Sequence, residues 1–188
     1  MDEIHHDLTY PDKPHVTFLK AAPEAEEISL VFTAATKTFN IAGCHTGTTI
    51  IPNPKLRAIY DREHAAFGKT PNRFGMIMTE AAYSEGEEWL NQLMHYLEKN
   101  KSIFTTAMKS LNKVKVFDLE STYLAWVDFS QLNISELELK NMLINEAGVA
   151  PSFGSGFGKN SGKFARFNIA CRTEILDLAI NRLTKTFL

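Results

Sequence analysis

The segment from Thr33 to Gly43 contains residues that could perform covalent chemistry. It reads TAATKTFNIAG, so Lys37 follows a short apolar run, with small residues before it and a glycine turn after it. Small side chains let a bulky ligand approach the backbone, and a desolvated lysine has a lowered pKa, which favours Schiff-base chemistry. A lysine after a strand is more often a surface charge, so this segment alone is a weak signal.

Two charged residues elsewhere favour a functional role for Lys37. Asp2 lies at an acidic strand end near the start of the same half of the chain. Arg166 lies in the middle of the apolar run 164–170, where a charge is not placed without a partner.

The glycine-rich stretch from Gly154 to Gly162 does not match a phosphate-binding pattern. A P-loop needs a glycine four residues ahead of Gly-Lys and a Ser or Thr after it, but Phe153 and Asn160 stand there. Its glycines read GxGxG and precede a strand rather than a helix, which also excludes the dinucleotide pattern. We expect a flexible surface loop.

The histidines and cysteines do not form a metal-binding pattern. His5 and His6 are adjacent, so on a strand they point to opposite faces. Cys44 and Cys171 lie far apart and lack ligand spacing, which is typical of buried reduced thiols in a cytosolic protein. We therefore expect no bound metal.

The composition is that of an ordinary globular protein. Of 188 residues, 44% are hydrophobic and 22% charged, which excludes disordered, collagen-like and coiled-coil chains. The formal net charge of -2 is unlike that of a nucleic-acid-binding protein. Apolar runs are too short for a membrane span and the first twenty residues are polar, so we expect neither a span nor a signal peptide, and a cytoplasmic location.

Hydrophobic periodicity divides the chain into two regions that must position these residues. Residues 1–83 alternate strand, helix and loop in an α/β manner, with strands over 28–33 and 45–51 and a helix over 55–67. Residues 84–188 suggest a separate α+β unit that begins with a long linking helix. Its expected elements are a helix from the capping box at Ser84 to Leu111, strands 114–117 and 122–127, a helix from Ser135 towards Glu146, strand 164–170 and helix 174–187.

Four motifs in order resemble the class I/II pyridoxal-phosphate (PLP) enzymes of the aspartate aminotransferase fold, fold type I. They are DEIHHDL at 2–8, TKTFNIAG at 36–43, TEAAY at 79–83 and RFNIA at 166–170. Within that superfamily they are most similar to the cystathionine β-lyase, or C-S lyase, branch (MalY/PatB-like). The resemblance extends over residues 2–188, so the expected fold is the C-terminal part of the PLP-binding large domain (1–83, incomplete) followed by a small α+β domain (84–188).

The resemblance implies a role for each candidate residue. Lys37 matches the lysine that binds PLP covalently and moves protons, and Asp2 matches the acid that pairs with the pyridine nitrogen. His5 stands near the ring oxygen, where aminotransferases commonly have a tyrosine. Arg166 matches the arginine that binds the substrate α-carboxylate in a bidentate fork. Thr36 is expected near the phosphate.

The sequence departs from the family pattern at two places. Eight residues after the lysine, many members have an arginine on the phosphate, and His45 stands here. Full-length members also begin well before the strand of Asp2, so the chain resembles a C-terminal half. The expected small-molecule partner is an amino-acid substrate. The expected protein partners are the missing N-terminal half and, in a full-length homodimer, a second copy, towards whose site the loop 70–74 would extend.

The activity implied by the resemblance is β-elimination from cystathionine or another S-substituted L-cysteine, giving pyruvate, ammonia and a thiol. A class I/II aminotransferase is the alternative, because the same three residues support it, although His5 and His45 favour the lyase. A truncated fragment without catalytic activity is the second alternative, because the phosphate-binding glycine loop and most of the large-domain sheet would be missing.

Overall fold

A computed structural model describes residues 1–68 and 70–188. These residues form two compact units, Met1–Met94 and His95–Leu188. The boundary lies inside the long helix α5 (Glu87–Ser110), so both units include a part of that helix. The division at residue 84 that the sequence suggested stays a prediction.

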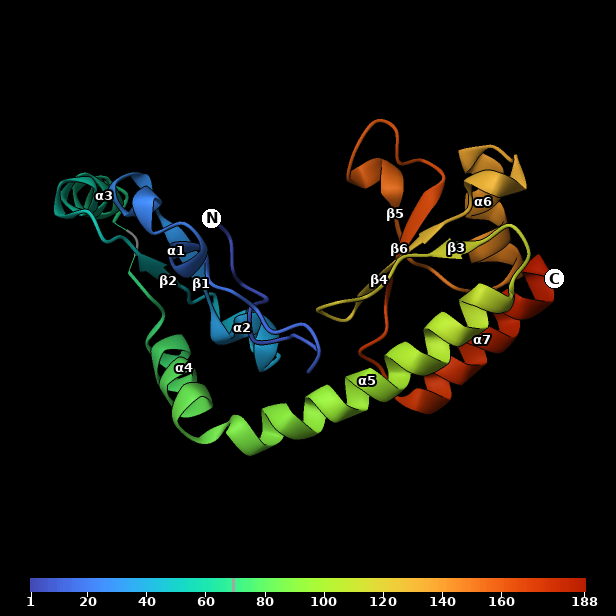
Figure 1. Ribbon diagram of the computed structural model, residues 1–188, viewed down its shortest axis with the longest axis horizontal. Coiled ribbons are helices and arrows are strands. Elements are labelled where there is room, and N and C mark those ends of the chain that lie inside the picture. The colour runs from blue at the N-terminus through green and yellow to red at the C-terminus, as the bar shows by residue number, and fades with distance from the viewer. Residues whose placement is uncertain (69) are drawn as a thin grey trace. The chain divides into compact units, whose positions relative to one another are not determined.

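The first unit contains a two-stranded antiparallel sheet with short helices around it (Figure 1). Val31 pairs with Ile50 and Thr33 with Thr48, so both strands lie within the runs that the sequence predicted. The elements are α1 (Phe18–Ala21), β1 (Val31–Thr33), α2 (Ala35–Thr38), β2 (Thr48–Ile50), α3 (Pro54–Ala66) and α4 (Arg73–Glu85).

Helix α3 begins and ends as its sequence predicts. The Asn53 side chain accepts hydrogen bonds from the backbone N–H groups of Lys55 and Leu56, and Pro54 occupies the first helical position. Gly68 follows the helix at φ 61°, the left-handed conformation that glycine adopts at low cost.

Helix α4 corrects two expectations. Arg73 and Phe74 of the expected loop 70–74 form its first turn, and the Asn72 side chain caps it by accepting from Phe74 N–H and Gly75 N–H. Ser84 lies in its last turn and donates to the Glu80 carbonyl, so the capping box predicted at Ser84 is wrong. The S-x-x-E pattern was misleading because the chain is already helical when it reaches the serine.

The second unit is an antiparallel four-stranded sheet in the order β3-β4-β6-β5. Trp126 lies opposite Arg166, and Val127 opposite Ala165. The elements are β3 (Lys115–Val116), β4 (Leu124–Asp128), α6 (Glu136–Asn141), β5 (Ser152–Phe153), β6 (Phe164–Asn168) and α7 (Thr173–Phe187). Apart from the short β5, each lies where the sequence predicted a strand or helix.

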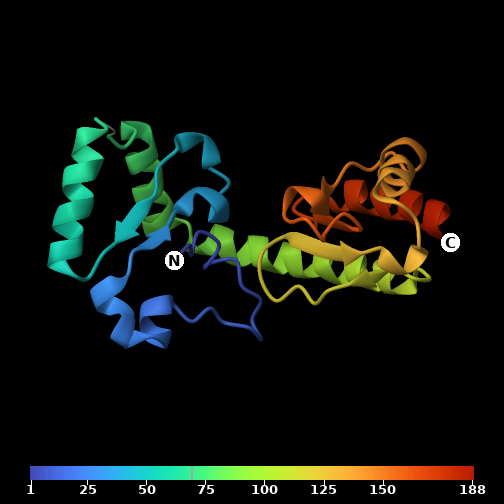
Figure 2. The ribbon, with the colours of Figure 1, turned by 90° about the horizontal axis from the view of Figure 1, so that it is seen from above.

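The core of the second unit lies between one face of this sheet and the helices α5 and α7. Figures 1 and 2 show both helices on the same side of the sheet. Ala125, Val127 and Ala165 are buried on that face, and the ring of Phe104 from α5 lies 5.4 Å from the ring of Phe167. Residues alternate between buried and partly exposed along both central strands, as expected for a sheet covered on one side.

Helix α6 begins with a complete capping box and ends in a π-helical turn. Ser135 accepts from Glu138 N–H, and the Glu138 carboxylate accepts from Ser135 N–H. From Met142 to Glu146 the turn widens, and Ala147 N–H donates to the Met142 carbonyl at 2.8 Å.

The glycine-rich segment predicted as a loop connects β5 to β6. At Gly154 a side chain has no room, because the Ser161 carbonyl lies where a Cβ would be. Among the described residues, no helix is both long and apolar enough to cross a membrane.

Candidate functional site

One cavity of about 640 Å³ in the first unit brings together several of the predicted site residues. Lys37, Asp2, Thr36 and His45 all line it. Its volume lies within the range of roughly 300–1,000 Å³ that is usual for small-molecule and cofactor sites. The other lining residues are Ile4, Phe32, Thr33, Ala34, Ala42, Thr46, Gly47, Thr48, Thr49 and Tyr60.

Asp2 reaches this cavity because the first residues of the chain run parallel to β1. Phe32 N–H donates to the Met1 carbonyl at 2.9 Å, and Glu3 N–H donates to the Phe32 carbonyl at 2.8 Å. The Asp2 Oδ1 atom accepts from Ile4 N–H at 3.0 Å, which fixes the carboxylate in a short turn. The acid is thereby held beside the strand that leads to the lysine.

Lys37 is presented by α2, a single helical turn that begins two residues after β1. Thr36 and Thr38 are buried, and Lys37 is half-buried. The turn continues into the next segment, since Ile41 N–H donates to the Thr36 carbonyl at 3.0 Å. The lysine is therefore fixed through its neighbours rather than by a long helix.

The tight turn after the lysine depends on residues other than the glycine that the sequence suggested. Asn40 (φ 54°) and His45 (φ 47°) adopt the left-handed conformation, whereas a Cβ on Gly43 would meet open space. Helix α4 packs on this turn through Gly75, where a Cβ would lie 2.6 Å from the Cys44 carbonyl oxygen. Gly75 is thus the glycine that the close approach requires.

His5 lies outside the set of described side chains that line the cavity. It is half-buried in the turn over residues 4–7. Its role near the ring oxygen of PLP stays a prediction.

Arg166 lies in the second unit, in the middle of β6. Its guanidinium carbon is 4.5 Å from the ring centre of Phe157, a residue of the glycine-rich loop. Its Nε is buried without a hydrogen-bond partner among the described residues, and such a group calls for an explanation. Burial raises the pKa of nearby Tyr123, and the positive charge of Arg166 opposes that rise.

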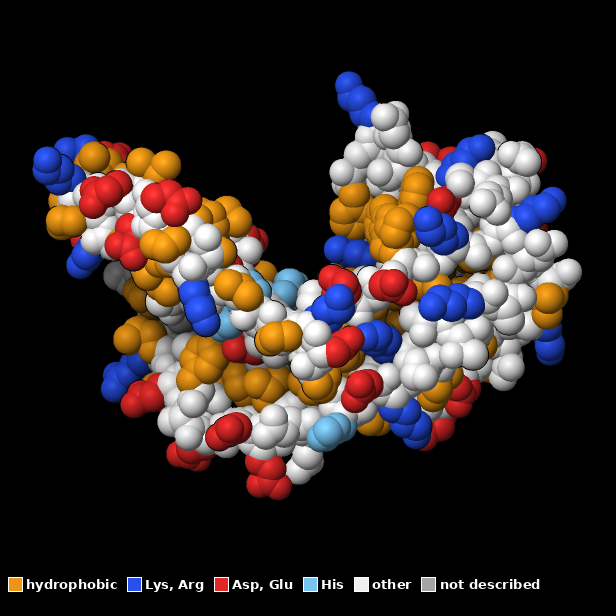
Figure 3. Space-filling view, in the orientation of Figure 1, with side chains coloured by type: hydrophobic (Ala, Val, Ile, Leu, Met, Phe, Trp, Pro, Cys, Tyr) orange, Lys and Arg blue, Asp and Glu red, His pale blue; other side chains and the backbone are white. Residues whose placement is uncertain are grey.

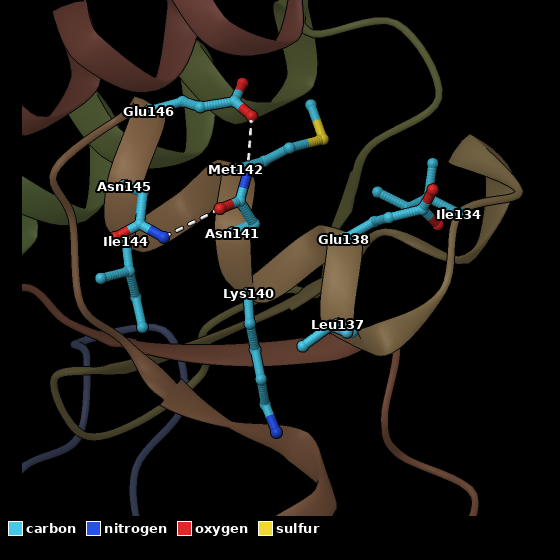
Figure 4. A pocket seen from close by; sticks show the side chains of 9 residues that line it. All are labelled: Ile134, Leu137, Glu138, Lys140, Asn141, Met142, Ile144, Asn145 and Glu146. Atoms are coloured by element: carbon cyan, nitrogen blue, oxygen red, sulfur yellow. Dashed lines mark hydrogen bonds between the residues drawn. The ribbon is translucent and has the colours of Figure 1, made fainter.

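A second cavity of about 670 Å³ lies over α6 and the π turn of the second unit (Figure 4). Its polar groups are largely bonded to one another: Asn141 donates to Glu146, and Asn145 donates to Asn141. The Glu138 carboxylate, which also lines it, is occupied by the capping box. This arrangement offers less to a polar ligand than the cavity around Lys37.

Metal-ligating side chains do not gather in the described part of the chain. Those residues include no group of three His, Cys, Asp or Glu side chains that could hold a metal ion. Cys44 and Cys171 are free thiols, and burial raises the pKa of Cys171.

Apart from that of Thr36, the hydroxyl groups of the cavity were not predicted from the sequence. Thr33, Thr46, Thr48 and Thr49 line it, and the Thr49 hydroxyl lies 3.1 Å from the Tyr60 hydroxyl. The threonine-rich run around β2 was the available signal, but it was interpreted only as strand propensity.

Comparisons with known proteins give matches over almost the whole chain. The cystathionine β-lyase PatB of Bacillus subtilis is 33% identical over 97% of this chain and 48% of its own length. A PLP-bound protein of Clostridium difficile 630, assigned as an aminotransferase, superposes with a TM-score of 0.94 at 33% identity, over 100% of this chain and 49% of its own. Cystalysin of Treponema denticola, which contains PLP, superposes with a TM-score of 0.92 at 30% identity, over 98% of this chain and 48% of its own.

The chain therefore spans about half the length of the proteins that it matches. No family profile matches it. The expected PLP-dependent, aspartate aminotransferase-like fold and the resemblance to the C-S lyase branch are confirmed.

Proposed function

Given this relationship to the cystathionine β-lyase branch of the PLP-dependent enzymes, we propose that the chain supplies the covalent lysine and the ring acid of a PLP-dependent C–S β-lyase. The observation that carries the proposal is the placement of Lys37 and Asp2 around one cavity of the first unit. A cytoplasmic location remains part of this proposal.

The donor set of the cavity fits PLP. The Lys37 amine can condense with the cofactor's aldehyde, and the Asp2 carboxylate can pair with a protonated pyridine nitrogen. Thr36 and neighbouring threonine hydroxyls can donate to a phosphate, and His45 takes the place of the arginine found in many relatives. When bound, PLP supplies an electron sink that weakens the bonds at the substrate's Cα.

The protein's own groups bind the substrate and move its protons. Lys37 takes the proton from Cα, and Asp2 holds the cofactor ring in its protonated state. Arg166 binds the substrate carboxylate; its planar guanidinium supports this role, as does its buried Nε, which has no hydrogen-bond partner among the described residues. In the net reaction the Cα–H and Cβ–S bonds break, the sulfur leaves as a thiol, and hydrolysis gives pyruvate and ammonia.

An aminotransferase is the second candidate, because the structural relative from Clostridium difficile 630 is assigned to that activity. The two activities differ in their need for an acceptor. Pyruvate formed from cystathionine without any keto acid supports the lyase, whereas activity only with a keto acid supports the aminotransferase.

The proposed macromolecular partners are a second copy of the chain and a polypeptide that supplies the rest of the relatives' length. Figure 3 shows apolar side chains gathered over α4 and the first turns of α5. Phe74 is 75% exposed, and Ile77, Met78 and Trp89 are each about half exposed. Such a concentration of apolar surface favours association.

The first test is PLP binding by the purified chain. We expect a visible absorption band on titration with PLP, and borohydride reduction should fix the cofactor on Lys37, as located by peptide mass mapping. Lys37→Ala should abolish the trapped product, whereas Lys55→Ala, which changes an exposed lysine of α3, should not. A wild-type chain that traps no PLP is a non-catalytic fragment by itself; β-elimination that persists in Lys37→Ala contradicts the assignment.

A further inference from the structure

Asp7 lies at the centre of a hydrogen-bond network beside the lysine turn. Its Oδ2 atom accepts from the Thr38 hydroxyl at 2.8 Å, and the Tyr83 hydroxyl lies 3.5 Å from the same oxygen. Its Oδ1 atom lies 3.0 Å from His6 Nε2. The Asp7 side chain is only 18% exposed, and the next residue, Leu8, is fully buried.

Thr38 is the member of this network that leads to Lys37. It follows Lys37 directly in α2 and is completely buried, so its hydroxyl depends on a protein partner. A bond from a buried hydroxyl to a carboxylate is charge-assisted and stronger than one between neutral groups. A helix of one turn has little cooperative stability of its own, so this bond matters for its orientation.

The other members connect Asp7 to β1 and α4. His6 Nδ1 lies 2.8 Å from the Glu3 carbonyl oxygen and 3.0 Å from the Thr33 hydroxyl of β1. Partial burial, and then the negative charge of Asp7, raise the pKa of Tyr83 in α4. The carboxylate therefore joins the N-terminal turn, β1, α2 and α4 of one unit.

We propose that Asp7 is a positioning residue that holds α2 in place and thereby sets the position of Lys37. This inference rests on the proposed function of Lys37. Asp7 does not line the cavity among the described residues, so it acts through Thr38 rather than on a ligand.

The test measures the position of Lys37 in the full chain without PLP. Reductive methylation with formaldehyde and a borane, followed by peptide mass mapping, gives the labelling rate of Lys37 relative to exposed Lys55. We expect a ratio below one in the wild type, because Lys37 is half-buried. In Asp7→Ala and Thr38→Val the ratio should rise towards one, and amide exchange in the peptide that contains α2 should become at least about tenfold faster, the effect of losing one charge-assisted bond.

Conservative variants separate positioning from a general loss of stability. Thr38→Ser keeps the donor and should restore the wild-type ratio, whereas Asp7→Asn keeps an acceptor without the charge and should give an intermediate ratio. Asp12→Ala removes an exposed carboxylate from the same part of the chain and serves as the matched control. An unchanged Lys37 ratio in folded Thr38→Val would overturn the proposal, as would equal effects of Thr38→Val and Thr38→Ser. Neither outcome depends on PLP binding, so the proposed function can fail separately.

Discussion

Replacing Asn100 with alanine should destabilise the second unit strongly. Asn100 lies in the middle of α5 and is fully buried. Its amide donates to the carbonyls of Ile169 and Cys171, both at 2.9 Å, and its Oδ1 accepts from the Thr173 hydroxyl at 3.0 Å. One side chain thus provides hydrogen-bond donors to two backbone carbonyls at the junction between β6 and α7.

The size of the effect follows from the groups left without partners. Each of the three bonds contributes roughly 0.5–1.5 kcal/mol, and a buried group left unsatisfied costs about 1–3 kcal/mol. We therefore expect a loss of about 3 kcal/mol in the free energy of unfolding of this unit. For a domain of roughly a hundred residues, that corresponds to a decrease in Tm of about 12–24 °C.

Urea unfolding followed by circular dichroism measures this loss, and hydrogen exchange assigns it to the second unit. Asn145→Ala, which removes an exposed amide that donates to Asn141, should stay within about 0.5 kcal/mol of the wild type. A cycle with Thr173→Val should show coupling, because the two side chains share a bond. A loss below about 1 kcal/mol for Asn100→Ala, or effects that simply add in the cycle, would refute the reasoning.

Three further predictions concern single residues. Gly75→Ala should lower the free energy of unfolding by about 1–3 kcal/mol in a urea experiment, because the new Cβ overlaps the Cys44 carbonyl. Gly43→Ala should have little effect, because a Cβ there meets open space. Equal losses in the two variants would contradict this packing. Burial raises the pKa of Tyr123 above its ordinary value of about 10, so the stability that it contributes is complete below that pH and lost above it. Tyr123→Phe should therefore lose less stability than the wild type between about pH 9 and pH 11 when unfolding is measured across that range. Ser135→Ala removes a helix cap and should cost about 1 kcal/mol, whereas Ser102→Ala on the exposed side of α5 should cost less than half of that.

The sequence predicted the parts of the fold that depend on local patterns. The strands β4 and β6 and the helices α3 and α7 lie where periodicity and capping residues placed them. The capping box at Ser135 is present with both of its bonds. These features arise from neighbours a few residues apart, which a sequence displays directly.

The features that the sequence did not predict depend on contacts between distant segments. Helix α4 lacks an obvious apolar period and packs through Gly75 on the turn after the lysine. Asn100 lies within an apolar stripe of α5 that includes Leu97 and Phe104, which indicates that its side chain is buried. Its hydrogen-bond partners could not be predicted in the same way, because they lie some seventy residues away in the sequence. The ring that stacks on Arg166 comes from a loop whose path the sequence did not specify.

The candidate site could be predicted only through resemblance. Lys37 was a weak signal by itself, and nothing local connected it with Asp2. The parallel run of the first residues along β1 brings both to one cavity. Asp7 was part of the DEIHHDL motif, but its bond to Thr38 crosses thirty-one positions of sequence and became visible only in the structure.

The π-helical turn at the end of α6, from Met142 to Glu146, contains one residue more than a regular α-helical turn. Leu139, Leu143 and Ala147 are buried and follow one another at intervals of four, which on an ordinary helix drift by about 40° at each step. The wider turn from Met142 to Glu146 takes up that drift and keeps all three on the buried side. Deleting one residue within that turn would give the buried residues the i, i+4, i+7 or i, i+3, i+7 spacing of a regular α-helix, so Ala147 would stay on the buried side. The buried face of this segment therefore survives a one-residue deletion, and the segment should tolerate that deletion better than a polar substitution at the fully buried Leu143.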